Sequence, residues 1–294
     1  MIDIQNLTKD YGAHRGVFDI TLHVAPGEVY GYLGPNGAGK STTLRHMMGF
    51  GRPDFGRITV RGLDAWEDQT EIKKFVGYLP GEISLPEDMK GLDYLRMLSK
   101  MRKMPSFQYA EQLLDYFELH ADTGIKRMSK GMKQKVAIVS AFMHNPDVIF
   151  LDEPTSGLDP LMQERFLRLV ATKKAQGKTV FLSSHIFEEV SKVCDRVGIL
   201  KTGTLINEVS MDEIRRSAHK TYTVEMKNYI GVPALMDAYP HARWAGLRMT
   251  VDITDDEINR FLQLLTNCEV LYLKEEKHSL EEYFMRYYEG GQAQ

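Results

Sequence analysis

The chain has few cysteines and little excess charge of either sign. Its 294 residues include two cysteines, Cys194 and Cys268, which lie far apart and have no other metal-ligating residues beside them. This content argues against a disulfide framework and fits a reducing compartment. The net charge of -3 provides no overall basic surface for nucleic acid or anionic lipid, although it leaves room for a local basic patch.

Long apolar runs are also missing. No stretch approaches the roughly 18 apolar residues that a membrane helix needs. The N-terminal residues Met1–Ile4 alternate between apolar and polar, without the basic region and apolar core of a signal peptide. We therefore expect a soluble chain that inserts no helix into a membrane and that acts on a membrane only through a partner.

What the sequence does contain is a phosphate loop, because Gly34–Thr42 matches the pattern G-x-x-x-x-G-K-[ST] at every fixed position. The loop follows a short apolar run, readable as a buried strand, and precedes apolar residues at helical spacing. Glycines in this context turn backbone N–H groups toward an anion at the positive end of a helix. Lys40 adds a positive charge for the β- and γ-phosphates, and Ser41 offers a hydroxyl to Mg²⁺. The residues expected to bind the nucleotide here are Gly34, Asn36, Gly37, Gly39, Lys40, Ser41 and Thr42.

Two adjacent carboxylates, Asp152 and Glu153, follow the apolar run Val148–Leu151. Acids at the carboxyl end of a strand face the crevice in which open α/β sheets bind ligands. Asp152 is suited to hold Mg²⁺ through water, and Glu153 to accept a proton from an attacking water. The alternative is a solvated pair of surface acids, which the phosphate loop disfavours.

Several other residues carry little information when each is taken alone. Tyr11 could stack on an adenine ring, but an aromatic residue in a loop is more often a packing or surface residue. Ser129 and Gly131 begin a helix, either as an ordinary N-terminal cap or as another anion site. His185 follows a strand and could contact a γ-phosphate, although a single His is more often structural.

The remaining patterns predict the organisation of the chain. Helical spacing from Gly91 onward predicts a helical insert at about residues 88–143. Beyond it, we expect the first domain to end near residue 215. Residues 216–294 read as strand, helix, strand, helix, strand, with the second helix at Asp255–Thr266, which predicts a small α+β domain of ferredoxin-like character. Its last helix, Ser279–Tyr288, has an aromatic face that either packs on its own domain or docks on a partner.

The motifs in their order resemble the ATP-binding subunit of an ABC transporter over roughly residues 1–215. They are Tyr11, the phosphate loop, Ser129–Gln134, Asp152-Glu153, Ser156–Asp159 and His185. The Gly-Tyr-Leu-Pro loop, the Ser-Lys-Gly-Met-Lys-Gln signature and the short C-terminal extension are similar to the branch paired with six-helix permeases of the drug and antibiotic exporter type. The fold that the resemblance implies is an α/β P-loop ATPase domain with a helical insert.

This resemblance implies a role for each matching residue in ATP hydrolysis. Tyr11 would stack on adenine, and Asp152 would support Mg²⁺. Lys40 would hold the phosphates during catalysis. Glu153 would be the general base, and His185 would sense the γ-phosphate.

It also implies two partners. Ser129 and Gly131 would close over the γ-phosphate bound by a second copy of the chain, and Asp159 would communicate between the two sites. ATP binding would drive this closure and hydrolysis would reset it. A separate permease would select the substrate, which the present sequence does not encode, and would hold the chain at the cytoplasmic face of the cell membrane.

The chain departs from the common family pattern at two places. Lys130, Gly131 and Met132 stand where the signature usually has two glycines and a glutamine. Gly81 and Glu82 follow the Gly-Tyr-Leu-Pro loop, where a glutamine usually contacts Mg²⁺ and the permease. A carboxylate binds metal differently from an amide, so Glu82 would replace the glutamine only in part.

Two alternatives belong to other functional classes. One is a soluble ABC-type ATPase that acts on nucleic acid or ribosomes, which is disfavoured by the lack of tandem cassettes, of a long coiled-coil insertion and of excess basic charge. The other is a phosphotransferase kinase. A kinase would need a site for a phosphate acceptor in place of a water-activating base, whereas Ser129 and Glu153 indicate hydrolysis. We therefore expect an exporter ATPase that binds no nucleic acid.

Overall fold

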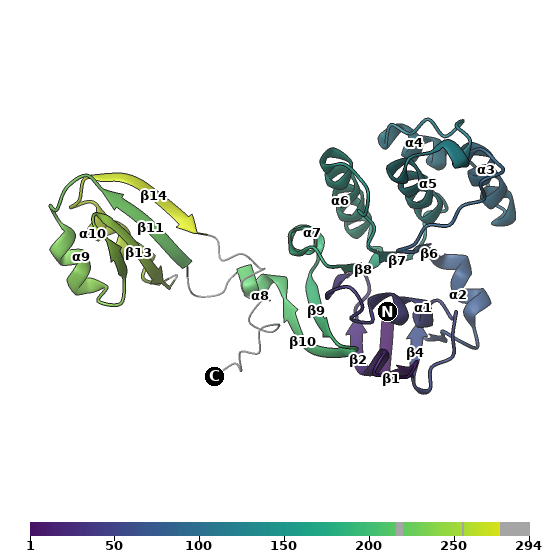
Figure 1. Ribbon diagram of the computed structural model, residues 1–294, viewed down its shortest axis with the longest axis horizontal. Helices are drawn as coiled ribbons and strands as arrows, with labels where there is room; N and C mark the ends of the chain where they lie inside the picture. The colour runs from purple at the N-terminus through teal and green to yellow at the C-terminus, as the bar shows by residue number, and fades with distance from the viewer. Residues whose placement is uncertain (216–219, 255, 277–294) are drawn as a thin grey trace. The chain divides into compact units, whose positions relative to one another are not determined.

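The computed structural model describes residues 1–215, 220–254 and 256–276, and the chain divides into two compact units (Figure 1). The first unit comprises Met1–Met211 and the second Asp212–Gln294.

The main sheet of the first unit is built from short apolar strands. Its strands are β3 (Val29–Leu33), β6 (Val76–Leu79), β7 (Val148–Asp152), β8 (Thr179–Ser184), β9 (Arg196–Lys201) and β10 (Thr204–Ser210). They lie in the order β10-β9-β3-β8-β7-β6, and all neighbours are parallel except β10 and β9. Every residue of β3, β7 and β8 is buried, as expected of parallel strands covered on both faces.

A second, antiparallel sheet shares the hydrophobic core of this unit. Its strands are β1 (Ile2–Asp10), β2 (Gly16–Val24), β4 (Phe55–Val60) and β5 (Leu63–Asp64), in the order β2-β1-β4-β5. Their buried side chains form one cluster with Leu44 and Met47 of helix α1 (Lys40–Met47) and with Tyr30 and Phe181 of the main sheet. The rings of Tyr30 and Phe181 stack with their centroids 5.4 Å apart. The helix that follows the phosphate loop is therefore anchored in the core.

Helices complete the first unit. They are α2 (Gln69–Phe75), α3 (Gly91–Met101), α4 (Gln108–Tyr116), η1 (Ile125–Arg127), α5 (Lys130–Phe142), α6 (Pro160–Ala175) and α7 (Phe187–Val193). The short helix α8 (Met211–Arg215) begins at the last residue of this unit and continues into the second. Helices α3, α4 and α5 group together beside α6 (Figure 1), in the stretch where the helical insert was expected. Arg165 of α6 ties this group to the rest of the unit, because its guanidinium lies 2.5 Å from the Glu118 carboxylate. Within the described residues, no helix combines the length and apolar character needed to cross a membrane.

The second unit contains β11 (Lys220–Met226), α9 (Val232–Ala238), β12 (Arg243–Ala245), β13 (Arg248–Ile253), α10 (Ile258–Leu265) and β14 (Val270–Glu276). Its antiparallel strands lie in the order β12-β13-β11-β14. Val224, Met249 and Phe261 are fully buried in its own core. The ferredoxin-like character of this unit stays a prediction, and the helix expected at Ser279–Tyr288 lies outside the described residues.

The sequence patterns were wrong about this unit in two details. They missed β12, because Arg243–Ala245 is too short to show an alternating pattern. They also began the next helix at Asp255, whereas α10 begins at Ile258. Glu257 explains the later start, since its carboxylate accepts hydrogen bonds from the N–H and hydroxyl of Thr254 at 3.0 and 2.9 Å and closes a turn before the helix.

Candidate functional site

The phosphate loop, Gly34–Thr42, connects the end of β3 to the start of α1. Gly39 has a φ of 106°, and a Cβ atom there would lie 2.7 Å from a methyl group of Val17. A Cβ atom at Gly34 would lie 2.6 Å from the carbonyl oxygen of Leu200. These positions therefore need glycine, and the close packing holds the loop at the positive end of α1.

Lys40 is the buried cation of this site. Its side chain is 5% exposed, and its ammonium donates hydrogen bonds to the carbonyl oxygens of Gly34 and Pro35 at 2.8 and 3.1 Å. The same ammonium lies 3.2 Å from a carboxylate oxygen of Glu153. Lys40 therefore connects the phosphate loop with the acid pair.

The acid pair lies at the end of β7, where β8 holds it in place. Asp152 is 2% exposed and pairs in register with Ser183, whose hydroxyl donates to its carboxylate at 2.5 Å. Glu153 has a φ of 45°, and its N–H donates to the Ser183 carbonyl oxygen at 3.1 Å. A carboxylate oxygen of Glu153 also lies 3.3 Å from Nδ1 of His185.

Glu153 thus stands between Lys40 and His185. The three residues come from the carboxyl ends of β3, β7 and β8, which are neighbours in the main sheet. This is the edge of an open α/β sheet at which ligands bind. The structure therefore brings Lys40 next to Glu153, which lies more than a hundred positions later in the sequence.

The oxygen donors expected to hold Mg²⁺ are the exposed Ser41 and the buried Asp152. Ser183 binds one oxygen of Asp152, and the other oxygen faces Gly81. Burial and then the negative charge of Asp152 raise the pKa of Tyr78 to about 12. Within the described residues, no cluster of three or more His, Cys, Asp or Glu side chains could hold a metal. The donors fit Mg²⁺, which is commonly bound by one or two carboxylates together with phosphate oxygens.

Gly81 lies directly beside this carboxylate. A Cβ atom at Gly81 would be 3.0 Å from an oxygen of Asp152, so a longer side chain would have to displace one of the two groups. Glu82, the next residue, is exposed. Gly81 therefore leaves space beside the Asp152 carboxylate that a side chain would fill.

Tyr11 is half exposed, at 53%, which leaves a face of its ring open for stacking. Lys9 lies 5.9 Å from the ring centroid and forms an ion pair with Asp54 at 2.7 Å. The loop that contains Tyr11 leads to Gly16, whose carbonyl oxygen would be 3.0 Å from a Cβ atom at Gly39. The loop of Tyr11 is thus adjacent to the phosphate loop.

The signature residues contact the turn after the acid pair. Ser129 caps α5, and its hydroxyl accepts a hydrogen bond from a backbone N–H at 3.2 Å. A Cβ atom at Gly131 would lie 2.9 Å from the carbonyl oxygen of Gly157, and the Lys130 ammonium donates to the Ser156 hydroxyl at 3.1 Å. Among the described residues, neither Ser129 nor Gly131 forms a hydrogen bond with the phosphate loop of the same chain.

Asp159 caps α6. Its carboxylate accepts a hydrogen bond from the N–H of Met162 at 3.0 Å, and Pro160 occupies the first helical position, which favours this start. Asp159 thus has a local role within its own chain, and its role between two sites stays a prediction.

The structure also shows a buried carboxylate that the sequence patterns missed. Glu189 is 5% exposed and accepts hydrogen bonds from the hydroxyls of Thr155 and Ser184, the latter at 3.0 Å. Burial raises its pKa, although both hydroxyls act in the opposite direction. Thr155 follows the acid pair closely and Ser184 directly precedes His185, so Glu189 joins the two segments. The sequence signal that could have indicated this cluster is the pair of serines, Ser183 and Ser184, that ends the apolar strand Thr179–Ser184.

Comparison with known proteins identifies the relatives of this chain. Residues 17–156 match the family model described as ABC transporter. An uncharacterized ABC transporter ATP-binding protein of Nostoc is 41% identical over 71% of this chain, which spans only 63% of that relative. The bacitracin transport ATP-binding protein BcrA of Enterococcus faecalis is 30% identical, with 99% of this chain and 97% of the relative covered.

A solved structure supports the same assignment. An ATP-binding subunit of an ABC transporter is 33% identical to this chain, with a TM-score of 0.67, and the match covers 74% of this chain and 92% of that structure. The sheet order, the helical insert and the phosphate loop described above thus occur together in a known fold. The chain belongs to the family of ABC transporter ATP-binding proteins.

Proposed function

We propose that this chain is the ATP-hydrolysing subunit of an ABC exporter. The observation that supports this proposal most directly is the position of Glu153, whose carboxylate lies 3.2 Å from the Lys40 ammonium and 3.3 Å from the His185 ring. A carboxylate next to a phosphate loop can activate water for attack on a bound triphosphate.

In this mechanism the phosphate loop binds the triphosphate. Its backbone N–H groups and Lys40 contact the β- and γ-phosphates, and Tyr11 stacks on the adenine ring. Ser41 and Asp152 hold Mg²⁺, which would neutralise the charge of the phosphates. Phosphate oxygens would replace the carbonyl and carboxylate oxygens that surround Lys40 in the present structure.

The hydrolytic step then depends on Glu153 and His185. Glu153 takes a proton from the attacking water, and general base catalysis of this kind contributes roughly 10²–10⁴-fold. His185 contacts the γ-phosphate, so it responds to whether that group is present. Ser183 holds Asp152 and the backbone of Glu153, which keeps both carboxylates oriented.

Each chain supplies half of a complete site. Lys130 and Gly131 contact the Ser156-Gly157 turn of their own chain, and among the described residues neither Ser129 nor Gly131 forms a hydrogen bond with the phosphate loop of that chain. We infer that they close over the ATP bound by a second copy in a head-to-tail dimer. Closure is then favoured by ATP, because the signature gains contacts only when the other chain holds a γ-phosphate.

The exporter assignment comes from the relatives. BcrA, which is similar over nearly the whole chain, is named a bacitracin transport protein. By analogy, this chain would drive a separate permease at the cytoplasmic face of the cell membrane, and the permease would select the substrate. The alternative of an ATPase acting on nucleic acid or ribosomes has no specific observation in its favour.

The general base can be tested with Glu153→Gln, which keeps the shape of the side chain but cannot accept the proton. We expect this variant to bind ATP like the parent, to lose roughly 10²–10⁴-fold in turnover and to accumulate as an ATP-bound dimer. ATP binding, steady-state hydrolysis and size-exclusion chromatography provide the readouts. Equal hydrolysis rates in variant and parent would contradict the assignment.

The transport assignment needs a separate experiment. Affinity purification of the tagged chain from membranes should recover an integral-membrane permease. Recovery of nucleic acid or ribosomes, without such a partner, would instead support the soluble alternative.

A further inference from the structure

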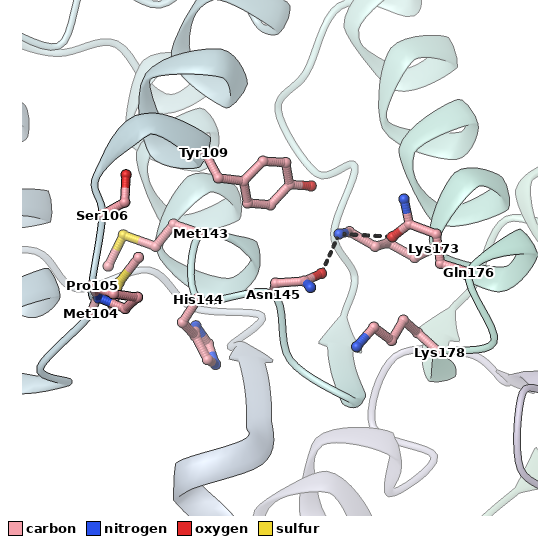
Figure 2. Close-up of a pocket in the computed structure, with 10 residues that line it drawn as sticks. All are labelled: Met104, Pro105, Ser106, Tyr109, Met143, His144, Asn145, Lys173, Gln176 and Lys178. Atoms are coloured by element: carbon pink, nitrogen blue, oxygen red, sulfur yellow. Dashed lines mark hydrogen bonds between the residues drawn. The ribbon is translucent and has the colours of Figure 1, made fainter.

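A cavity of about 580 Å³ lies between the helical insert and the ends of α5 and α6 (Figure 2). It is at the opposite end of the sheet from the ATP site. Asn145 lies just before β7 and Lys178 just before β8, whereas Glu153 and His185 follow these strands. A strand of this length spans roughly 20 Å, so the cavity is separate from the proposed catalytic centre.

The cavity contains a buried cation without an acidic partner. Lys173 is 2% exposed, and its ammonium donates to the side-chain oxygens of Asn145 at 2.8 Å and Gln176 at 3.2 Å. The ammonium also lies 4.6 Å from the ring centroid of Tyr109. Among the described residues, Lys173 forms no ion pair with a carboxylate. Burial, followed by the charge of Lys178, lowers the pKa of Lys173 to about 8, so these neutral partners do not fully offset its desolvation.

The carboxylate of Asp147 is already shared by two other cations. Asp147 binds the Lys178 ammonium at 2.8 Å and the Arg61 guanidinium at 2.8 Å, through different oxygens. This part of the cavity therefore has more positive than negative charge. His144 adds no charge at neutral pH, because burial lowers its pKa to about 4.

The opposite side of the cavity is apolar. Figure 2 shows Met104, Pro105 and Met143 on the side of the cavity away from the lysines. Cavities of this size with mostly apolar walls and a few convergent polar groups are typical of small-molecule sites. The combination would suit a ligand with an apolar body and an anionic end.

We propose that this cavity binds a small organic carboxylate, with its carboxylate near Lys173 and Lys178 and its apolar chain against Met104 and Met143. Such a ligand would provide the negative charge that Lys173 lacks. It would also bridge the insert and α6, since Tyr109 and Lys173 come from these two elements.

The test uses the full chain with ¹³C-labelled methionine methyl groups at neutral pH, and octanoate as the probe. We expect saturable shifts of the Met104 and Met143 signals, which can be assigned from single Met→Leu variants. 1-Octanol has the same apolar chain without the charge and should bind much more weakly. Lys173→Gln should weaken octanoate binding by roughly tenfold, as expected for the loss of one charge-assisted hydrogen bond.

Lys192→Gln is the matched control, because Lys192 pairs with Glu188 at the surface of α7. Its octanoate affinity should equal that of the parent, and unchanged methionine signals elsewhere would show that each variant is folded. Three outcomes would each overturn the proposal: no saturable shift up to about 10 mM octanoate, equal binding of octanoate and 1-octanol, or unchanged octanoate affinity in folded Lys173→Gln.

Discussion

A hydrogen-bonded carboxylate holds the segments that flank the proposed general base and His185. Glu189 accepts hydrogen bonds from Thr155, close behind Glu153, and from Ser184, directly before His185. A single buried carboxylate thus connects the two segments that carry the proposed base and the proposed γ-phosphate sensor. Small displacements of catalytic groups have large effects on rate, so we assign Glu189 a positioning role.

This role predicts the behaviour of Glu189→Ala. The substitution leaves two buried hydroxyls without their acceptor, and we expect the kcat for ATP hydrolysis to fall roughly tenfold while the KM for ATP changes little. Glu189→Gln can still accept one of these hydrogen bonds and should recover most of the activity.

The control is Glu188→Ala, which removes the neighbouring exposed carboxylate and its ion pair with Lys192. Its kcat should match that of the parent. If Glu189→Ala lowers thermal stability and leaves kcat intact, Glu189 is structural only and the positioning role is wrong.

The lowered pKa of the Lys173 ammonium predicts how the unfolding free energy depends on pH. Its pKa in the folded state is about 8, below the value of about 10.4 for an unfolded chain. The folded state therefore disfavours the protonated form, and the unfolding free energy of the parent should rise relative to Lys173→Gln as the pH increases from 8 toward 10.5. Chemical denaturation of both proteins across this range measures the difference, and a constant difference would contradict the pKa shift.

Among the elements, the loop after β6 is one of the two places at which the chain departs from the family pattern. Gly81 leaves room beside Asp152 that a Cβ atom would occupy at 3.0 Å. Because Ser183 also restrains this carboxylate, we expect a side chain at position 81 to strain the metal-binding end of β7.

Gly81→Ala should therefore lower ATP hydrolysis several-fold and raise the Mg²⁺ concentration needed for half-maximal activity. Gly124→Ala provides the control, because a Cβ atom there would meet nothing within 4 Å. Titration of the hydrolysis rate with Mg²⁺ distinguishes the two variants. An unchanged Mg²⁺ dependence in Gly81→Ala would show that Asp152 tolerates the added methyl group.

The elements that could be predicted were those with a local signal. The phosphate loop, the buried strand before the acid pair and the helical insert all follow from spacing within one segment. β12 has too few residues for a pattern, and the start of α10 depends on a turn closed by Glu257. These boundaries depend on particular hydrogen bonds, which composition and periodicity do not report.

For the whole molecule, the proposal of half-sites predicts complementation between two inactive variants. Lys40→Ala disables the phosphate loop, and Ser129→Arg obstructs the signature. In a symmetric head-to-tail dimer each pure variant has one lesion in every site, whereas a mixed dimer has both lesions in one site and none in the other.

An equimolar mixture should therefore regain about a quarter of the parent activity, because random pairing leaves about a quarter of all sites intact. The rate of the parent should also rise more than linearly with protein concentration when the dimer is dilute. A rate strictly proportional to concentration, together with no regained activity in the mixture, would indicate that one chain contains a complete site.

The sequence by itself determined the phosphate loop, the acid pair and the family resemblance, because each depends on residue types at short, fixed spacings. The tertiary structure decided which groups support them. Ser183 and Glu189 reach Asp152 and Thr155 across 31 and 34 positions. The register of β7 and β8 places Ser183 beside Asp152, and the packing of α7 places Glu189 beside Thr155. The cavity around Lys173 likewise exists only where the insert meets α6, since buried charge depends on neighbours in space rather than in sequence.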